Sequence, residues 1–264
     1  MDEQHRQAVA RMWELGDYRL VAERLRPAAE KLAEAVGAGH GRSALDVAAG
    51  TGSVAVALAN RGWRVGAADI APALIEHGRE HTQGLEIDWH EAPLDALPFP
   101  DDSLDLVASS FGLIFVPDPS AALAEIRRCL RTGGRLAFTA WTPDGYMGQM
   151  TAVMMGFLPP GPAGAASPMD WGRPDVIAER LSAAGFTVSS SQLHAVPWEF
   201  DSPEAGTTFL FEHSPAHVAS ASMVADQAPA MIQAVQAHLA ECACTIDGPV
   251  RLAAEYTLTL AEAT

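Results

Sequence analysis

Apolar positions along the chain follow two different periods, and the changes of period predict the elements. In residues 3–36 apolar side chains recur every three to four positions, which predicts two or three short helices with breaks at Gly16 and Pro27. Between residues 44 and 141, short apolar runs alternate with segments of helical period. The runs predict strands at 44–48, 63–69, 85–90, 104–110 and 135–141. Regular alternation of strands and helices indicates an α/β fold with a largely parallel sheet.

The C-terminal half predicts further helices and two more strands. Helices are expected at 146–157, 173–184, 203–212 and 215–243, and strands at 186–196 and 250–260. Segment 200–244 is apolar on one face and too short to fold alone, so we expect it to cap the site. The expected division is an N-terminal helical lid (1–41), an α/β core (42–199), a helical cap inserted before the last strand (200–244) and the final strand of the core sheet (245–264).

The stretch Ser43–Leu58 has the pattern of a nucleotide-binding turn, with a short strand, a run of small residues and the start of a helix. Glycines let the backbone approach a ligand closely, and the free N–H groups at a helix start favour polar or anionic groups. Gly50–Ala55 fits the dinucleotide pattern G-x-G-x-x-G/A, and Asp69 follows where a ribose-binding acid is expected. An NAD(P)-dependent oxidoreductase is therefore one alternative, although no Tyr-x-x-x-Lys pair follows.

Other motifs resemble class I S-adenosylmethionine (SAM) methyltransferases. Asp46–Gly52 (DVAAGTG) resembles the D-x-G-x-G-x-G turn of that family, with Ala48 at the first glycine. Residues 97–107 (LPFPDDSLDLV) and 130–136 (LRTGGRL) are typical of its type 11 group, which includes enzymes of ubiquinone and menaquinone biosynthesis. The resemblance covers residues 43–141 and favours SAM over a dinucleotide.

The resemblance implies a Rossmann-like, doubly wound sheet of seven strands in the order 3-2-1-4-5-7-6, with strand 7 antiparallel. It implies SAM as the cofactor and S-adenosylhomocysteine (SAH) as the product. Asp69 should accept hydrogen bonds from the ribose hydroxyls, and Tyr18 lies in a W-x-x-G-D-Y motif similar to the cofactor lid of small-molecule methyltransferases. Pro93 stands where the family has an acid for adenine, which leaves that contact either to the Leu94 backbone N–H or to another acid, with Glu91 and Asp95 nearby. The implied cofactor-binding residues are Tyr18, Asp46, Ala48, Ala49, Gly50, Thr51, Gly52, Asp69, Ile70, Pro93, Leu94, Ser110 and Phe115.

Transfer of a sulfonium methyl depends on in-line orientation of the acceptor and on exclusion of water. We expect the acceptor pocket to contain Trp13, Phe111, Trp141, Tyr146 and Met150, which favours a small apolar or aromatic acceptor. If the acceptor is a hydroxyl, a histidine is the natural base near neutral pH; His213 is the candidate, with His217 beside it. The methylated atom (O, C, N or S) stays open, as does a SAM-binding protein that uses the cofactor for a non-transfer role.

The amino-acid composition argues against several classes of binding partner. The 264 residues include 17 basic and 33 acidic ones, a net charge of −16, which disfavours nucleic acid and anionic membrane surfaces. Cys129, Cys242 and Cys244 do not have the spacing of a disulfide framework or a zinc site, and we expect no metal. Neither a signal peptide nor an apolar run of transmembrane length is apparent, so the sequence predicts a cytoplasmic monomer or homodimer.

Overall fold

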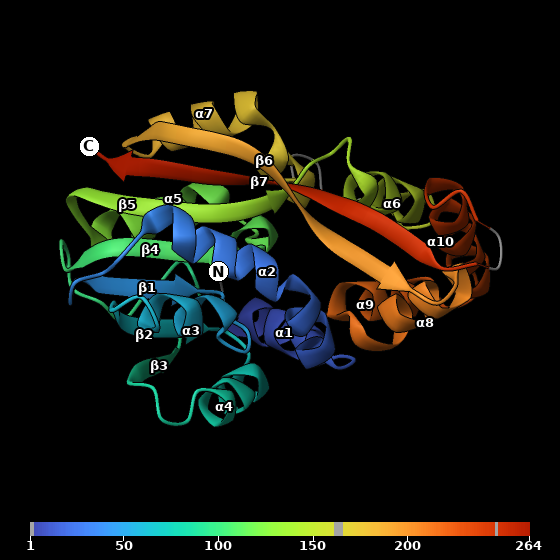
Figure 1. Cartoon of the computed structure of the whole chain (residues 1–264), viewed down its shortest axis with the longest axis horizontal. Helices are drawn as coiled ribbons and strands as arrows, with labels where there is room; N and C mark the ends of the chain where they lie inside the picture. The colour runs from blue at the N-terminus through green and yellow to red at the C-terminus, as the bar shows by residue number, and fades with distance from the viewer. Residues whose placement is uncertain (1–2, 161–165, 246–247) are drawn as a thin grey trace.

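The computed structural model describes residues 3–160, 166–245 and 248–264, and these form one sheet with helices on both faces (Figure 1). The strands are β1 (Ser43–Val47), β2 (Arg64–Asp69), β3 (Ile87–Glu91), β4 (Leu104–Ser110), β5 (Leu130–Trp141), β6 (Phe186–Phe200) and β7 (Val250–Ala263). Their order is β3-β2-β1-β4-β5-β7-β6; β7 is antiparallel to both its neighbours and the other pairs are parallel. The predicted fold class and strand order are confirmed.

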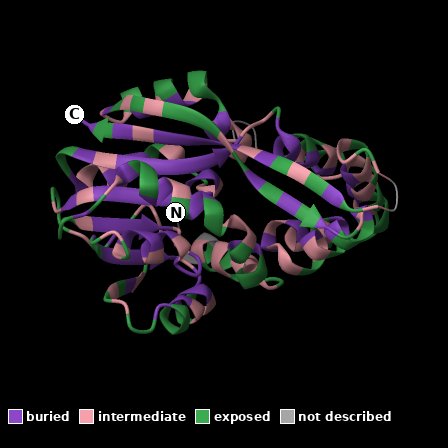
Figure 2. Cartoon of the chain, viewed as in Figure 1, coloured by how far each residue is buried: buried purple, intermediate pink, exposed green. Residues whose placement is uncertain are grey.

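The connections place helices on both faces of the sheet. From β1 the chain adds β2 and β3 on one side, and from β4 it adds β5 on the other. Because parallel crossovers are right-handed, α3 (Ser53–Ala59) and α5 (Pro119–Cys129) lie on opposite faces. Helices α4 (Pro72–His81) and α7 (Pro174–Ala183) extend these layers. Residues 106–108 of β4 are fully buried, as expected of a strand covered on both sides, and Figure 2 shows buried residues concentrated on the central strands.

Two N-terminal helices, α1 (Glu3–Trp13) and α2 (Tyr18–Val36), precede β1, and α2 crosses the front of the sheet in Figure 1. The predicted break near Gly16 is confirmed, but the break predicted at Pro27 is wrong, because α2 runs through it. Pro27 is exposed, so the carbonyl that it leaves without an N–H partner can bind water. The opposite, buried face of α2 holds the helix on the sheet.

Strands β6 and β7 extend beyond the rest of the sheet as a two-stranded arm. Residues 250–255 of β7 pair with β6 alone, because the pairing of β7 with β5 stops at Tyr256. In Figure 1 the arm reaches α6 (Tyr146–Met155), α8 (Pro203–His213), α9 (Pro215–Met223) and α10 (Ala228–Cys242). Two 3-10 turns, η1 (Leu113–Phe115) and η2 (Pro168–Gly172), complete the elements described.

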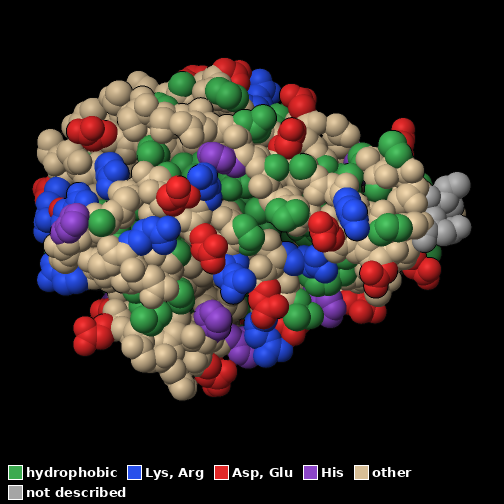
Figure 3. Space-filling view, in the orientation of Figure 1, with side chains coloured by type: hydrophobic (Ala, Val, Ile, Leu, Met, Phe, Trp, Pro, Cys, Tyr) green, Lys and Arg blue, Asp and Glu red, His purple; other side chains and the backbone are tan. Residues whose placement is uncertain are grey.

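The single helix predicted at 215–243 is wrong, because the structure has two helices there, α9 and α10. Pro229 lies in the first turn of α10, where its missing N–H is tolerated, whereas inside a continuous helix it would break a hydrogen bond. No helix in the three described segments is long and apolar enough to cross a membrane. On the face shown in Figure 3, acidic and basic side chains are interspersed.

Candidate active site

The turn between β1 and α3 contains three residues with positive φ. This angle is +49° at Ala48, +55° at Gly50 and +84° at Gly52. Glycine adopts such angles freely, whereas an alanine does so at a cost of about 1–2 kcal/mol. Asp46 stabilises the turn from behind, because its buried Oδ2 accepts a 2.9 Å hydrogen bond from the N–H of Ala55 in α3. Burial raises the pKa of the Asp46 carboxyl well above its usual range.

Asp69 ends β2 beside this turn. Its Oδ2 accepts a 2.7 Å hydrogen bond from the Gly50 N–H, and its Oδ1 accepts a 2.9 Å hydrogen bond from the Ala71 N–H. The side chain is buried, and burial raises the pKa of its carboxyl. Each carboxylate oxygen can accept a further hydrogen bond, so the residue fits the pair of hydroxyls on a ribose.

Tyr18, the first residue of α2, covers the glycine turn. A Cβ atom built on Gly50 would lie 2.8 Å from Cε1 of Tyr18, so only glycine allows this contact. Burial raises the pKa of the Tyr18 hydroxyl, and the neighbouring carboxylates of Asp69 and Asp46 raise it further. The ring of Trp13 meets Tyr18 edge-on at 5.9 Å and Phe115 at 4.9 Å, so these aromatic side chains form one rim.

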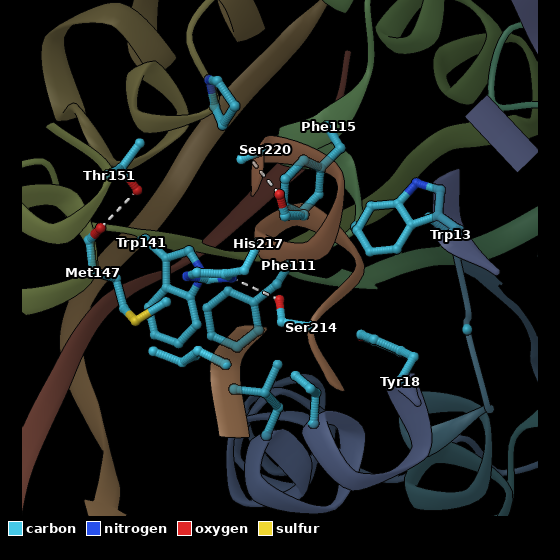
Figure 4. Close-up of a pocket in the computed structure, with 18 of the residues that line it drawn as sticks. Trp13, Tyr18, Phe111, Phe115, Trp141, Met147, Thr151, Ser214, His217 and Ser220 are labelled. Atoms are coloured by element: carbon cyan, nitrogen blue, oxygen red, sulfur yellow. Dashed lines mark hydrogen bonds between the residues drawn. The ribbon is translucent and has the colours of Figure 1, made fainter. Parts of the chain in front are cut away.

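A cavity of about 270 Å³ extends from the glycine turn into the space under α6, α8 and α9 (Figure 4). Its lining includes ten of the predicted site residues, namely Trp13, Tyr18, Ala48, Gly50, Asp69, Ile70, Phe111, Phe115, Trp141 and Met150. Phe111 stacks on Trp141 with ring centroids 3.9 Å apart, and both meet Tyr256 edge-on. The Phe111 backbone, with a φ of +58°, is held by a 3.1 Å hydrogen bond from its N–H to Oγ1 of Thr139. The glycine turn with Asp69 and the stacked rings of Phe111 and Trp141 therefore line the same cavity.

Seven predicted cofactor residues lie outside the lining of this cavity. Asp46, Ala49, Thr51 and Ser110 line a narrow hollow of about 20 Å³ under α2, together with Tyr18 and Ala48. Gly52 packs against the indole of Trp89, which would lie 2.9 Å from a Cβ atom. Pro93 and Leu94, in the loop after β3, are half-buried and are not part of the cavity lining.

Tyr146 was expected in the acceptor pocket, but the structure places it outside the cavity lining. Its hydroxyl donates a 3.3 Å hydrogen bond to Sδ of Met150, and its ring stacks on His238 with centroids 5.6 Å apart. The side chain is buried between α6 and α10, where it supports Met150 from behind. Met150 itself contributes to the cavity.

The structure also separates the two candidate histidines. His213 lines a different surface hollow, beside Phe209 and Glu212, rather than the cavity. The chain bends at Ser214, between α8 and α9, so that His217 turns inward and becomes buried. Ring Nδ1 of His217 lies 2.8 Å from Oγ of Ser214, and burial lowers the pKa of His217 to about 4.

Sequence reasoning missed several residues that line this cavity. They are Val21, Leu25, Leu74, Gly112, Met147, Thr151, Met154, Met155, Leu158, Pro168, Met169, Trp198, Leu210, Ser214, Ala216, and Ser220. The alternation of Val196, Trp198 and Phe200 along β6 signals a buried face, but not what that face contacts. Half of the missed residues come from α6, α8, α9 and the arm, whose positions depend on tertiary packing.

Comparison with known proteins finds similarity to methyltransferases in the α/β core, as the sequence motifs do. Residues 45–138 match the family described as "Methyltransferase domain". An uncharacterized protein of Mycobacterium tuberculosis is 38% identical over 176 residues, covering 66% of this chain and 63% of the relative. The ubiquinone/menaquinone biosynthesis C-methyltransferase UbiE of Hahella chejuensis is 42% identical over 103 residues, covering 36% of this chain and 41% of UbiE.

Among solved structures, the YcgJ protein of Bacillus subtilis aligns with a TM-score of 0.61 at 16% identity, covering 89% of this chain and 98% of YcgJ. That likeness concerns the fold. An antiparallel β7 between β5 and β6 also differs from the all-parallel 3-2-1-4-5-6 sheet of dinucleotide-binding domains. The motifs, the sheet order and the matched domain therefore agree: residues 45–138 are similar to a methyltransferase domain, and the sheet has the strand order that the resemblance to class I SAM-dependent methyltransferases implies.

Proposed function

We propose that this protein transfers a methyl group from SAM to a small, uncharged, apolar or aromatic acceptor. The observation that carries the proposal is the single cavity that joins the carboxylate of Asp69 and the Gly50 turn to the stacked pair Phe111 and Trp141. A cofactor site and an acceptor site must share one space if a methyl group is to pass directly between two molecules.

On the cofactor side, we assign Asp69 to the ribose hydroxyls and the backbone of the Ala48–Gly52 turn to the amino-acid end of SAM. Ile70 and Leu74 supply apolar contact next to Asp69, which suits a nucleobase. Since Pro93 and Leu94 lie outside the cavity lining, we assign adenine to this apolar pair rather than to the loop after β3. Tyr18 covers the turn and excludes water from it.

When bound, SAM supplies a methyl group already activated by its sulfonium. The residues of this chain therefore have to orient the acceptor and keep water out, a contribution of about 7–11 kcal/mol in well-oriented reactions. Phe111 and Trp141 offer flat faces for an aromatic acceptor. Met147, Met150 and Met154 add flexible apolar contacts, which can adapt to the outline of a ligand.

The charges in the cavity argue for an uncharged acceptor. Among the described residues of its lining, Asp69 is acidic and none is Lys or Arg. An acceptor with a phosphate or carboxylate would lose its hydration without gaining a cation, at a cost of several kcal/mol. A neutral ring system avoids that cost.

Calorimetry tests the cofactor assignment. We expect titration with SAH to show saturable binding and titration with NADH to show none. Binding of NADH without binding of SAH would refute the proposal. Once SAH binding is established, methyl transfer from radiolabelled SAM to a panel of neutral aromatic compounds, scored against the same compounds with a carboxylate added, tests the acceptor class.

A further inference from the structure

Two buried nitrogen atoms, on two residues that line the cavity, have no hydrogen-bond partner among the residues that the structure describes. They are Nε1 of Trp198, on β6, and Nε2 of His217, on α9. The side chains are 2% and 7% exposed, and both line the cavity. An unpaired buried polar group costs about 1–3 kcal/mol, so such atoms need an explanation in a native protein.

His217 is held in place by its other ring nitrogen. Nδ1 lies 2.8 Å from Oγ of Ser214, and the ring of Phe211 meets the imidazole at 5.5 Å. Ser214 is the N-cap residue of α9, yet its side chain makes no capping hydrogen bond and contacts the imidazole instead. Because Nδ1 is committed to Ser214, Nε2 is the atom that remains for a ligand.

The chemistry of the two atoms limits what can pair with them. A serine hydroxyl can donate or accept, so the Ser214 contact allows either tautomer of His217. A ligand hydroxyl, which also donates and accepts, satisfies Nε2 in both cases. The indole of Trp198 is a donor only, so its partner must be an acceptor such as a second oxygen. Figure 4 shows His217, Phe111 and Trp141 at one side of the cavity, where an aromatic ligand would bring such oxygens.

We propose that the acceptor is a neutral aromatic molecule with two oxygen substituents: a hydroxyl that hydrogen-bonds Nε2 of His217, and a second oxygen that accepts from Nε1 of Trp198. This inference rests on the proposed function, because it takes the cavity to be the methyl-acceptor site. His217 and Trp198 are then positioning residues that select the acceptor and fix its orientation.

A matched pair of probes tests the hydroxyl: 4-methoxy-1-naphthol, and 1,4-dimethoxynaphthalene, in which the hydroxyl is methylated. Calorimetry on the full chain, with and without SAH, should show that the naphthol binds about tenfold more tightly, which is the value of one hydrogen bond to a buried group. His217→Phe should abolish this preference, whereas His217→Gln, which keeps a polar group near Nε2, should retain part of it. Trp198→Phe should weaken the binding of both probes, since each carries an oxygen that can accept the indole hydrogen bond.

His213→Phe is the matched control, because His213 lines a separate surface hollow, and it should leave the preference unchanged. Nitrogen-15 NMR adds a readout that packing alone would not move: the Nε2 resonance of His217 should shift with the naphthol and not with the diether. Thermal melts show whether each variant is folded. If His217→Phe does not fold, His217→Gln still tests the hydrogen bond.

Equal affinity for the two probes, absence of binding by the naphthol, or a preference that survives His217→Phe would overturn the inference. SAH binding measured on the same samples keeps the two proposals separate. If SAH binds and the probes are not distinguished, the acceptor assignment fails and the proposed function stands. If the preference is present without SAH binding, the methyltransferase proposal fails.

Discussion

A Cβ atom on Gly50 would lie 2.8 Å from Cε1 of Tyr18, so the missing side chain at position 50 lets α2 begin directly over the glycine turn. The same residue donates its N–H to Asp69. Gly50 therefore joins the N-terminal helices to the acid that ends β2, and a change at this position should affect both stability and ligand binding.

We expect Gly50→Ala to destabilise the protein and to weaken SAH binding about tenfold or more. Its φ of +55° costs an alanine about 1–2 kcal/mol, and the overlap with Tyr18 adds about 1–3 kcal/mol. Urea denaturation and calorimetry measure the two effects. Gly84→Ala is the matched control, since Gly84 has a φ of +89° and nothing within 4 Å of its Cβ position. Gly84→Ala should lose only the stability that an alanine at positive φ costs. Equal losses of unfolding free energy in Gly50→Ala and Gly84→Ala would contradict the contact between position 50 and Tyr18.

Gly112 and Ala48 provide a second packing test. A Cβ atom on Gly112 would lie 2.5 Å from Cβ of Ala48 and 2.8 Å from the Ala48 carbonyl oxygen. We expect Gly112→Ala to cost about 1–3 kcal/mol of unfolding free energy. In an Ala48→Gly background that cost should fall, because the overlap with the Ala48 Cβ atom is gone. Additive effects in the double-mutant cycle would show that the two residues do not meet as described.

Removal of the Asp69 carboxylate should weaken SAH binding. Asp69→Ala loses hydrogen bonds to the ribose, worth about 1.5–3 kcal/mol, or about 10–150-fold in affinity. Asp69→Asn, which keeps one acceptor oxygen, should lose less. Asp88→Ala, at an exposed site on β3, is the control and should bind SAH normally. Unchanged affinity in a folded Asp69→Ala protein would remove Asp69 from the site.

Burial of neutral His217 should make the fold sensitive to acid. Its pKa is about 4 in the folded protein, against 6.5 for the unperturbed group. Between these values the unfolded chain binds a proton that the folded chain does not, so stability falls as the pH drops from 6.5 to 4. The loss attributable to this residue is on the order of 3 kcal/mol. Denaturant unfolding gives the free energy of unfolding of the parent and His217→Phe proteins at each pH in this range. The contribution of His217 is the difference between the two slopes of that free energy against pH. Parallel pH profiles would show that His217 does not titrate in this way.

The sequence by itself determined the α/β core. Strand β4 was predicted at its observed bounds, because a continuous apolar run with turns on both sides admits few other structures. The resemblance carried by residues 97–107 and 130–136 supplied the strand order, including the antiparallel β7 that periodicity does not reveal. Asp69 and the Gly50 turn were also placed together correctly, since the carboxyl ends of adjacent parallel strands meet at one edge.

Only the tertiary structure decided which side chains meet in the cavity. His213 and His217 are four residues apart, one turn of a helix, so as neighbours on one helix they would share a face; the bend at Ser214 sends them to different surfaces. Tyr146 lies behind Met150 because α10 packs on α6, a long-range contact without a local signal. Local hydrogen bonding and periodicity fix elements, whereas the direction of a side chain across packed helices depends on their bends and relative positions, which no short stretch of sequence specifies.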